Sequence, residues 1–210
     1  MYWIYCDTEF TGLDPITNHI LEVGMVVTNP GTFKPLASYH SFVRPDMITP
    51  KTWDQEAQDI HKITIRQANA FPSAGTVCQE ILKFLEPYKQ DRMANLFISH
   101  VLEQSFWDQG KRRMSYGKID FKHLLWMFHK EDLGYDLQRF ITESNQLSTI
   151  TLARKKGYKG NSLEAWAERL EVDYSKGHTA MFDTELLIKV HEFLMSPKKI
   201  KESSLQKTLF

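Results

Sequence analysis

Residues that favour β-strands are concentrated near the start of this 210-residue chain, and they constrain its fold more than any other feature. The runs 2–6 (YWIYC) and 19–31 (HILEVGMVVTNPG) are apolar, and the second ends at the turn residues Asn29, Pro30 and Gly31. We interpret them as two strands of a hairpin-like unit. A third strand is predicted over 36–45, where Pro45 ends it.

Helical patterns dominate the rest of the chain. Apolar spacing predicts a helix over 74–87, and residues 95–100 (NLFISH) form an expected buried strand. Aromatic-rich segments within 101–156 look helical. Two further helices are predicted over 162–172, with Ser162 as N-cap, and over 179–195. Strands, a helix, another strand and then mostly helices predict an α/β fold with a mixed sheet.

Composition indicates one globular domain without a strong overall charge. Lys plus Arg and Asp plus Glu are equal at 26 each, so any contact with nucleic acid must be local or assisted by a metal. The only cysteines, Cys6 and Cys78, are too few for a disulfide framework and favour a reducing compartment. No run reaches the roughly 18 apolar residues of a membrane span, and we therefore expect a soluble, cytoplasmic protein.

Two acids stand one residue apart in the stretch YCDTEFTGLDP. If the strand continues through them, Asp7 and Glu9 project from the same face, because side chains on a strand alternate. Carboxylates this close repel each other unless a cation lies between them, and hard divalent ions such as Mg²⁺ and Mn²⁺ prefer such oxygen ligands. The alternative is that both acids are solvated turn residues after the strand.

The stretch GHTAMFDTELL near the other end adds His178 and Asp183. Five residues on a helix correspond to about 140° of rotation, so the two side chains cannot share a face if both are helical. We expect His178 in the loop before the helix and Asp183 pointing inward, where an acid among apolar neighbours needs a partner. The alternatives are a first-turn acid favoured by the helix dipole and a loop histidine with no role.

These stretches resemble one family when they are taken together. DTEFTGLDP, FVRPD with IHKIT, FISH, TLARKKGYKGNSLEAWAERLEV and HTAMFD are similar, in order and spacing, to the motifs of the DEDDh 3′-to-5′ exonucleases. This family includes the proofreading subunit of bacterial replicative DNA polymerase, ribonuclease T and oligoribonuclease. The resemblance covers residues 2–195 and implies a ribonuclease-H-like fold, in which helices flank a mixed β-sheet.

The resemblance also implies four acids around two divalent metal ions, Mg²⁺ or Mn²⁺, with a histidine beside them. Asp7, Glu9 and Asp183 match three of these acids, and His178 matches the histidine, which would act as general base.

The remaining acid is harder to place. The family shows His-Asn followed closely by Phe-Asp, whereas this chain reads SHVLEQSFWDQG. We assign the role to Asp108 through its FWD context, assuming a short insertion. Glu103 is an alternative ligand, and Asp108 could instead be a surface helix residue.

By the same resemblance, a group of residues near the first acids would hold the terminal nucleotide. An aromatic ring can stack on an unpaired base, although core packing explains Phe10 equally well. The family predicts a 3′-to-5′ exodeoxyribonuclease acting on single-stranded or frayed DNA 3′ ends. The alternatives are an RNA-trimming exonuclease and a binding module that lost activity. The predicted substrate-binding residues are Phe10, Thr11, Leu13 and His61.

A polar, lysine-rich segment over 196–210 follows the predicted domain of residues 1–195 and ends in QKTLF. We expect a flexible tail. The ending resembles the Q-x-x-L-F peptide with which bacterial polymerases and repair proteins dock on the sliding clamp, with Gln206, Leu209 and Phe210 as its contacts. A polymerase subunit is a second candidate partner, and packing of the tail on its own domain is the alternative. Residues 115–150 receive no functional assignment.

Overall fold

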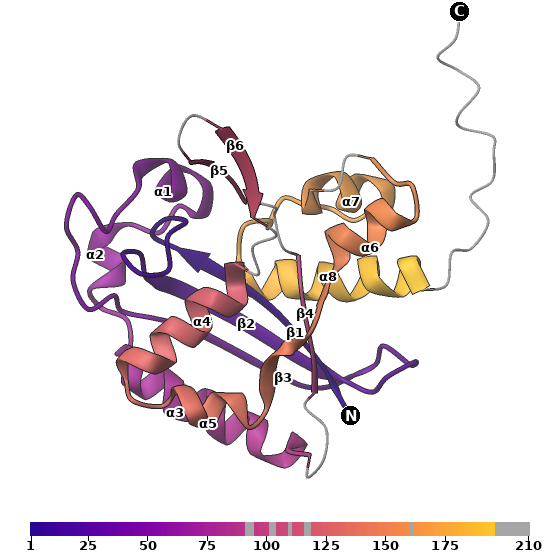
Figure 1. Ribbon diagram of the computed structural model, residues 1–210, viewed down its shortest axis with the longest axis horizontal. Helices are drawn as coiled ribbons and strands as arrows, with labels where there is room; N and C mark the ends of the chain where they lie inside the picture. Colours follow the sequence, from indigo (N-terminus) through magenta and orange to yellow (C-terminus); the bar gives the residue numbers. More distant parts are fainter. Residues whose placement is uncertain (91–94, 101–103, 109–110, 116–118, 160–161, 196–210) are drawn as a thin grey trace, which may run out of the picture.

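The computed structural model describes residues 1–210 except 91–94, 101–103, 109–110, 116–118, 160–161 and 196–210 (Figure 1). Its main sheet has the strand order β3-β2-β1-β4-β7. β1 is antiparallel to β2, and β2 to β3, whereas β1 with β4 and β4 with β7 are parallel. The predicted α/β fold with a mixed sheet is confirmed. The strands are β1 (Trp3–Phe10), β2 (Ile20–Thr28), β3 (Pro35–Phe42), β4 (Asn95–Ser99) and β7 (Ile141–Ser148).

The first strands agree with the sequence pattern, and β1 is longer than expected. Every residue of β2 is buried, which explains its mostly apolar sequence, because layers cover both of its faces. β1 continues past the predicted residues 2–6, since pairing with β2 extends to Phe10. Asp7 and Glu9 therefore lie within the strand and are not solvated turn residues.

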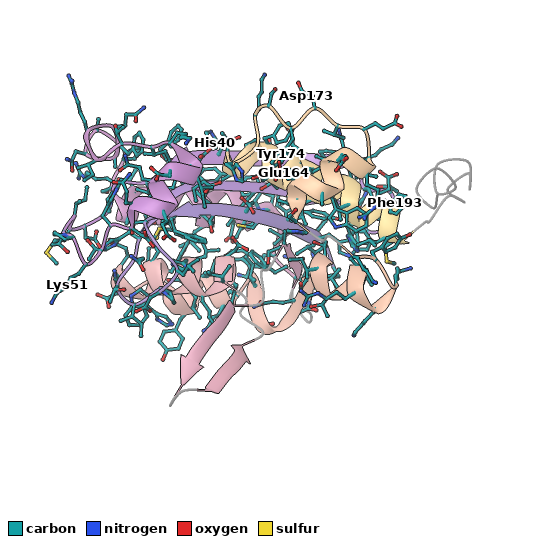
Figure 2. All side chains as sticks on the ribbon, turned by 90° about the horizontal axis from the view of Figure 1, so that it is seen from above. His40, Lys51, Glu164, Asp173, Tyr174 and Phe193 are labelled. Atoms are coloured by element: carbon teal, nitrogen blue, oxygen red, sulfur yellow. The ribbon has the colours of Figure 1, made fainter. Side chains whose placement is uncertain are left out.

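Two helical layers enclose the sheet (Figures 1 and 2). On one face, α3 (Ala74–Leu85), α4 (Ile119–Lys130) and α5 (Gly134–Gln138) pack against alternate residues of β1 and β2, which include Ile4 and Met25. On the other face, α8 (Ala180–Met195) covers Tyr5 and Val26. α6 (Thr149–Lys155) and α7 (Leu163–Arg169) pack on α8, and Ser162 caps α7 as predicted.

A smaller group of elements closes the end of the sheet that carries the acids. α1 (Gln55–His61) and α2 (Ile65–Ala68) begin at the N-caps Asp54 and Thr64, and the turn between them packs on the start of β2. The 3₁₀-helix η1 (Glu86–Tyr88) ends α3 at the opposite side. Across the described residues, no helix has both the length and the apolar character needed to cross a membrane.

The sequence analysis expected helices in aromatic-rich segments within 101–156, and two parts of this range form strands instead. β5 (Gln104–Asp108) and β6 (Lys111–Ser115) form a two-stranded antiparallel hairpin, and β7 is the edge strand of the main sheet. β7 reads ITESNQLS, a polar sequence tolerated at an edge, and its pairing with β4 determines its structure. The expectation is correct for α4, α5 and α6.

Candidate active site

Asp7 and Glu9 lie on one face of β1, near the carboxyl end of the strand. Asp7 pairs with Gly24 and Glu9 with Glu22 on the neighbouring strand β2. Both acids are partly exposed, whereas Thr8 between them is buried on the opposite face. The alternation expected for a strand therefore brings the two carboxylates together.

Gly24 allows α8 to approach the sheet closely enough to add a third acid. A Cβ at this position would lie 2.5 Å from the backbone oxygen of Ala180, so only glycine fits beneath the first turn of α8. The hydroxyl of Thr184 donates to the backbone oxygens of Gly24 and Ala180, at 3.1 and 2.7 Å. Because Gly24 is the partner of Asp7, this contact brings Asp183 next to the acids of β1.

The carboxylates of Asp7, Glu9 and Asp183 form one cluster. One oxygen from each lies within 4.8 Å of the others, an arrangement that could hold a metal ion. Asp183 is buried, and its Oδ1 has no hydrogen-bond partner among the described residues. An unsatisfied buried carboxylate oxygen beside two further acids is the donor set expected for a hard divalent cation. The residues present therefore fit such an ion.

The loop before α8 places His178 beside this cluster. His178 has a left-handed backbone with φ of 61°, and its N–H donates to Asp183 Oδ2 at 3.1 Å. The hydroxyl of Tyr174 donates to the same oxygen at 3.4 Å, and the Tyr174 ring lies edge-on to His178 at 5.5 Å. As predicted, His178 precedes the helix and Asp183 points inward. The backbone of His178 makes the contact with Asp183, and the side chain of His178 is exposed.

A fourth acid that the sequence reasoning missed, Asp120, reaches the same place from the opposite face of the sheet. It is the second residue of α4 and is 3% exposed, and its Oδ1 accepts a hydrogen bond of 2.9 Å from Thr8 Oγ1. The sequence feature that could have indicated Asp120 is an acid in the first turn of the helix that follows β4. The β5–β6 hairpin separates that helix from the FISH motif.

Burial raises the pKa of all four acids, and repulsion from neighbouring acids adds to the rise at Asp7 and Glu9. Burial, followed by the charges of Asp120 and Glu9, holds the pKa of Asp7 well above its usual range. Burial, followed by the charge of Asp183, raises the pKa of Glu9 to about 8, and burial raises the pKa values of Asp120 and Asp183 to about 6. Without a counter-ion the cluster therefore retains protons, and a bound cation would replace them.

A cleft of about 350 Å³ surrounds the cluster. Among the described residues, no lysine or arginine lines this cleft, which is strongly acidic. Glu164 and Tyr174, both labelled in Figure 2, belong to its wall. Seven of the lining residues are carboxylic acids: Asp7, Glu9, Asp54, Glu56, Asp120, Glu164 and Asp183.

Three of the four predicted substrate residues also line the cleft, namely Phe10, Leu13 and His61. Phe10 stacks on the ring of His123 at 4.4 Å. Thr11 does not line the cleft. Its hydroxyl accepts the backbone N–H of His19 and its backbone oxygen that of Asp54, so this buried residue closes the loop after β1.

His61 has a defined tautomer. Its Nδ1 accepts the N–H of Ile63 at 2.9 Å, which places the ring proton on Nε2. Burial lowers the pKa of His61 to about 4, so the ring is neutral at ordinary pH. Nε2 is buried without a hydrogen-bond partner among the described residues, in a residue that lines the cleft.

The other predicted site residues lie where the structure describes the backbone alone or describes nothing. Asp108 is the last residue of β5 and pairs with Lys111, in a hairpin whose side chains lie outside the described part of the structure. Glu103, Gln206, Leu209 and Phe210 lie outside the described residues altogether.

Comparison with known proteins gives one family match and several related folds. The model of the RNase_T exonuclease family matches residues 4–191. Exonuclease I of E. coli in complex with a dA16 oligonucleotide has a TM-score of 0.69 at 14% identity, over 94% of this chain and 41% of its own. The nuclease domain of 3′hExo, a DEDDh family member bound to rAMP, has a TM-score of 0.61 at 15% identity, over 92% of both chains. No curated protein sequence matches the chain.

The mixed sheet and its flanking helices form a ribonuclease-H-like fold, and the family match shows that the class of the protein is that of a nuclease. The chain spans 41% of exonuclease I, so it matches part of that enzyme. It belongs to the DEDDh 3′-to-5′ exonuclease family, and the resemblance found in its motifs is confirmed.

Proposed function

We propose that this protein is a metal-dependent 3′-to-5′ exodeoxyribonuclease that releases nucleoside monophosphates from single-stranded or frayed DNA 3′ ends. The observation that carries the proposal is the convergence of Asp7, Glu9, Asp120 and Asp183 in one cleft beside His178. A nuclease must stabilise a negatively charged phosphate, and such a set of acids is suited to that task only with cations.

Asp7, Glu9, Asp120 and Asp183 would hold two divalent ions, Mg²⁺ or Mn²⁺. This set makes Asp120 the candidate for the position that the sequence pattern assigned to Asp108, because Asp120 lines the cleft and its charge acts directly on Asp7. When bound, the ions supply positive charge to the scissile phosphate and lower the pKa of water.

The remaining chemistry belongs to side chains of the chain itself. His178 would take the proton of the attacking water at its imidazole, since its backbone N–H is already held by Asp183. Tyr174, through its hydroxyl on the same carboxylate, positions the loop. The leaving 3′-oxygen would receive its proton from solvent.

The terminal nucleotide would lie against Phe10 and Leu13, with His61 donating a hydrogen bond from Nε2. Phe10 is already stacked on His123 and so presents a fixed apolar surface, which favours an unpaired base. Leu13 is 49% exposed at the rim and would contact the same nucleotide.

RNA is the second candidate substrate. The 3′hExo nuclease domain, which matches over 92% of both chains, was solved with rAMP, whereas exonuclease I was solved with a DNA oligonucleotide. The chemistry at the phosphate does not distinguish the sugars. We favour DNA because the terminal sequence QKTLF resembles a clamp-docking peptide.

The deciding experiment digests matched, end-labelled single-stranded DNA and RNA oligonucleotides with Mg²⁺, with Mn²⁺ and with EDTA. Stepwise, metal-dependent shortening of DNA from its 3′ end, lost in Asp7→Ala, is the expected result. Preference for RNA would support the second candidate. If neither oligonucleotide is cleaved, a binding module without activity becomes the candidate function. Absence of metal binding in a titration would support that alternative.

We further propose that residues 1–195 form the exonuclease domain and that residues 196–210 form a tail. The tail would dock through Gln206, Leu209 and Phe210 on a sliding clamp, and a polymerase subunit would be a second partner in proofreading or repair. Deleting 206–210 should abolish co-elution with the clamp and preserve cleavage of short oligonucleotides. Loss of both co-elution and cleavage would contradict the proposal that these residues only tether the protein to the clamp. Cys6 and Cys78 are buried free thiols, which supports a reducing, cytoplasmic location.

A further inference from the structure

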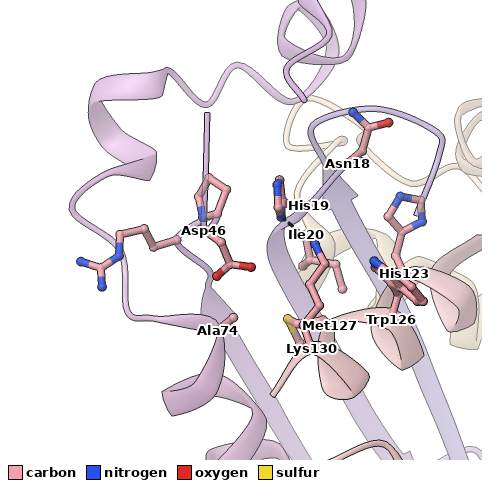
Figure 3. A pocket seen from close by; sticks show the side chains of 11 residues that line it. Asn18, His19, Ile20, Asp46, Ala74, His123, Trp126, Met127 and Lys130 are labelled. Carbon is pink, nitrogen blue, oxygen red and sulfur yellow. Dashed lines mark hydrogen bonds between the residues drawn. The ribbon is translucent and has the colours of Figure 1, made fainter. Parts of the chain in front are cut away.

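A second hollow region adjoins the far end of α4, away from the acid cluster (Figure 3). It consists of a small pocket and an open depression of about 730 Å³, which share His19, Asp46 and Lys130. In Figure 3, the side chain of Lys130 reaches His19, and Asp46 lies on the other side of the hollow from Trp126. We call this region the basic groove and define it by Arg44, Lys51, Trp126 and Lys130, with His19 and Asp46 between them.

The cations of the basic groove are available for a ligand. Arg44, Lys51 and Lys130 are exposed, and within the described ranges none of them has a carboxylate at ion-pair distance. Lys130 Nζ lies 3.5 Å from His19 Nδ1. Asp46 is the one acid among all the described residues that line either hollow. Three cations and one anion therefore give the lining of the two hollows a net charge of +2.

The basic groove and the cleft are connected through α4. Asp120 in the first turn of the helix lies in the cleft, and Lys130 at its end lies in the groove, about 15 Å farther along the axis at 1.5 Å per residue. His123 between them lines the groove, stacks on Phe10, and has its Nε2 3.1 Å from the backbone oxygen of Gly12. Phe10 and Gly12 line the cleft. The cleft and the basic groove therefore lie on either side of the contact that His123 makes with these two residues.

A nucleic-acid strand longer than a few nucleotides needs such a region. Each strand of a duplex carries one phosphate per 3.4 Å along the axis, and single strands are likewise densely charged. The described walls of the cleft supply carboxylates and no lysine or arginine. Trp126 is 37% exposed beside the cations, and an exposed aromatic ring within a positively charged groove is the usual combination in single-strand binding.

We propose that the basic groove binds the sugar-phosphate backbone of the strand whose 3′ end occupies the cleft. Arg44, Lys51 and Lys130 contact phosphates, and Trp126 stacks on a base. The groove therefore sets the preference for long over short substrates, while the chemistry takes place at the other end of α4. This inference rests on the proposed nuclease function.

The test compares two triple variants of equal charge change in the full-length chain. One is Arg44→Ala/Lys51→Ala/Lys130→Ala. The control, Lys83→Ala/Lys155→Ala/Lys189→Ala, removes exposed lysines from α3, α6 and α8. Two quantities are measured: the ratio of kcat/KM for a dT20 oligonucleotide to that for the dinucleotide pdTdT, and the salt dependence of dT20 binding in EDTA by fluorescence anisotropy. Thermal unfolding of each variant verifies that it is folded.

In the groove variant, the ratio of kcat/KM values should fall about 10-fold, and the slope of log K against log salt should become shallower by about 2, or about 0.7 for each lost phosphate contact. The control should retain both wild-type values. An unchanged ratio and slope, or equal losses in the control, would overturn the inference. If the wild-type protein cleaves neither substrate, the proposed nuclease function fails, and the salt slope of dT20 binding alone then decides whether the groove binds nucleic acid.

Discussion

The two ends of α4 face surfaces of opposite charge and opposite burial. At the first end, the buried Asp120 lies beside the acids of β1 and α8. Withdrawal from water raises the pKa of Asp120, and both withdrawal from water and the charges of neighbouring acids raise that of Asp7. At the other end, Lys130 and its neighbours are exposed and lack carboxylate partners within the described residues. Buried charge is stabilised only by a specific counter-ion, whereas exposed charge is screened by salt. The first arrangement suits catalysis, and the second suits binding.

This contrast predicts separable defects. Substitutions in the cleft should act on kcat, on metal affinity and on the pH dependence of stability. Substitutions in the basic groove should act on KM for long substrates and on its response to salt.

The largest effect is expected from Asp120→Asn, matched with Asp108→Asn. Asp120 is buried in the acid cluster, so its loss should lower kcat at least about 10³-fold, equivalent to roughly 4 kcal/mol of transition-state stabilisation. Asp108→Asn should change kcat less than about threefold if Asp120 is the ligand. Single-turnover cleavage of labelled DNA measures both. The reverse order would return the role to Asp108.

Replacing His178 should remove proton transfer without weakening metal binding. His178→Ala keeps the backbone N–H that holds Asp183, so metal affinity should remain within about twofold, while kcat falls about 10²- to 10³-fold. Isothermal titration with Mn²⁺ and cleavage assays separate the two effects. Unchanged cleavage would exclude the imidazole from the mechanism.

The metal-free protein should be less stable at pH 8 than at pH 5. The folded pKa of Glu9, about 8, lies above its unfolded value of 4.5, so its contribution to stability is present below pH 4.5 and is lost as the pH rises through 8. Asp7→Asn should raise Tm at pH 8 in EDTA by roughly 5 °C, as repulsion of a few kcal/mol is relieved. It should also abolish stabilisation by Mg²⁺. Calorimetry at both pH values checks this, and a wild-type Tm that is independent of pH would contradict it.

The smallest effect belongs to a single groove residue. Lys130→Ala should weaken dT20 binding about threefold at moderate salt and reduce the salt slope by about 0.7, because one phosphate contact is lost. Fluorescence anisotropy at several NaCl concentrations measures this change, with Lys189→Ala as the matched helical control. A decrease in kcat for pdTdT with no change in slope would show that the two ends of α4 are not independent.

Sequence reasoning placed side chains correctly where their positions depend on local spacing. The i, i+2 relation of Asp7 and Glu9 required only a strand, and the rotation between His178 and Asp183 required only a helix start. It also placed Phe10, Leu13 and His61 in the eventual cleft through the family motifs.

It was less successful where long-range packing decides the outcome. Asp120 was not considered because the β5–β6 hairpin lies between β4 and α4, and spacing in the sequence does not show which later residue returns to the cleft. Thr11 resembles a substrate residue in the motif, yet its hydroxyl and backbone close the loop after β1. β7 is polar because it lies at the sheet edge, a position determined by its pairing with β4.

The β5–β6 hairpin is structurally separate from the central sheet. Its two strands pair with each other in a separate sheet, while the flanking residues His100 and Ile119 both lie at the cleft wall. Because its strands pair with each other and not with the main sheet, this hairpin can be exchanged for another whose ends meet the same gap, with the central sheet retained. We expect an exchange of this hairpin to change substrate preference more than it changes the stability of the sheet, since loops on a rigid scaffold vary without altering the scaffold.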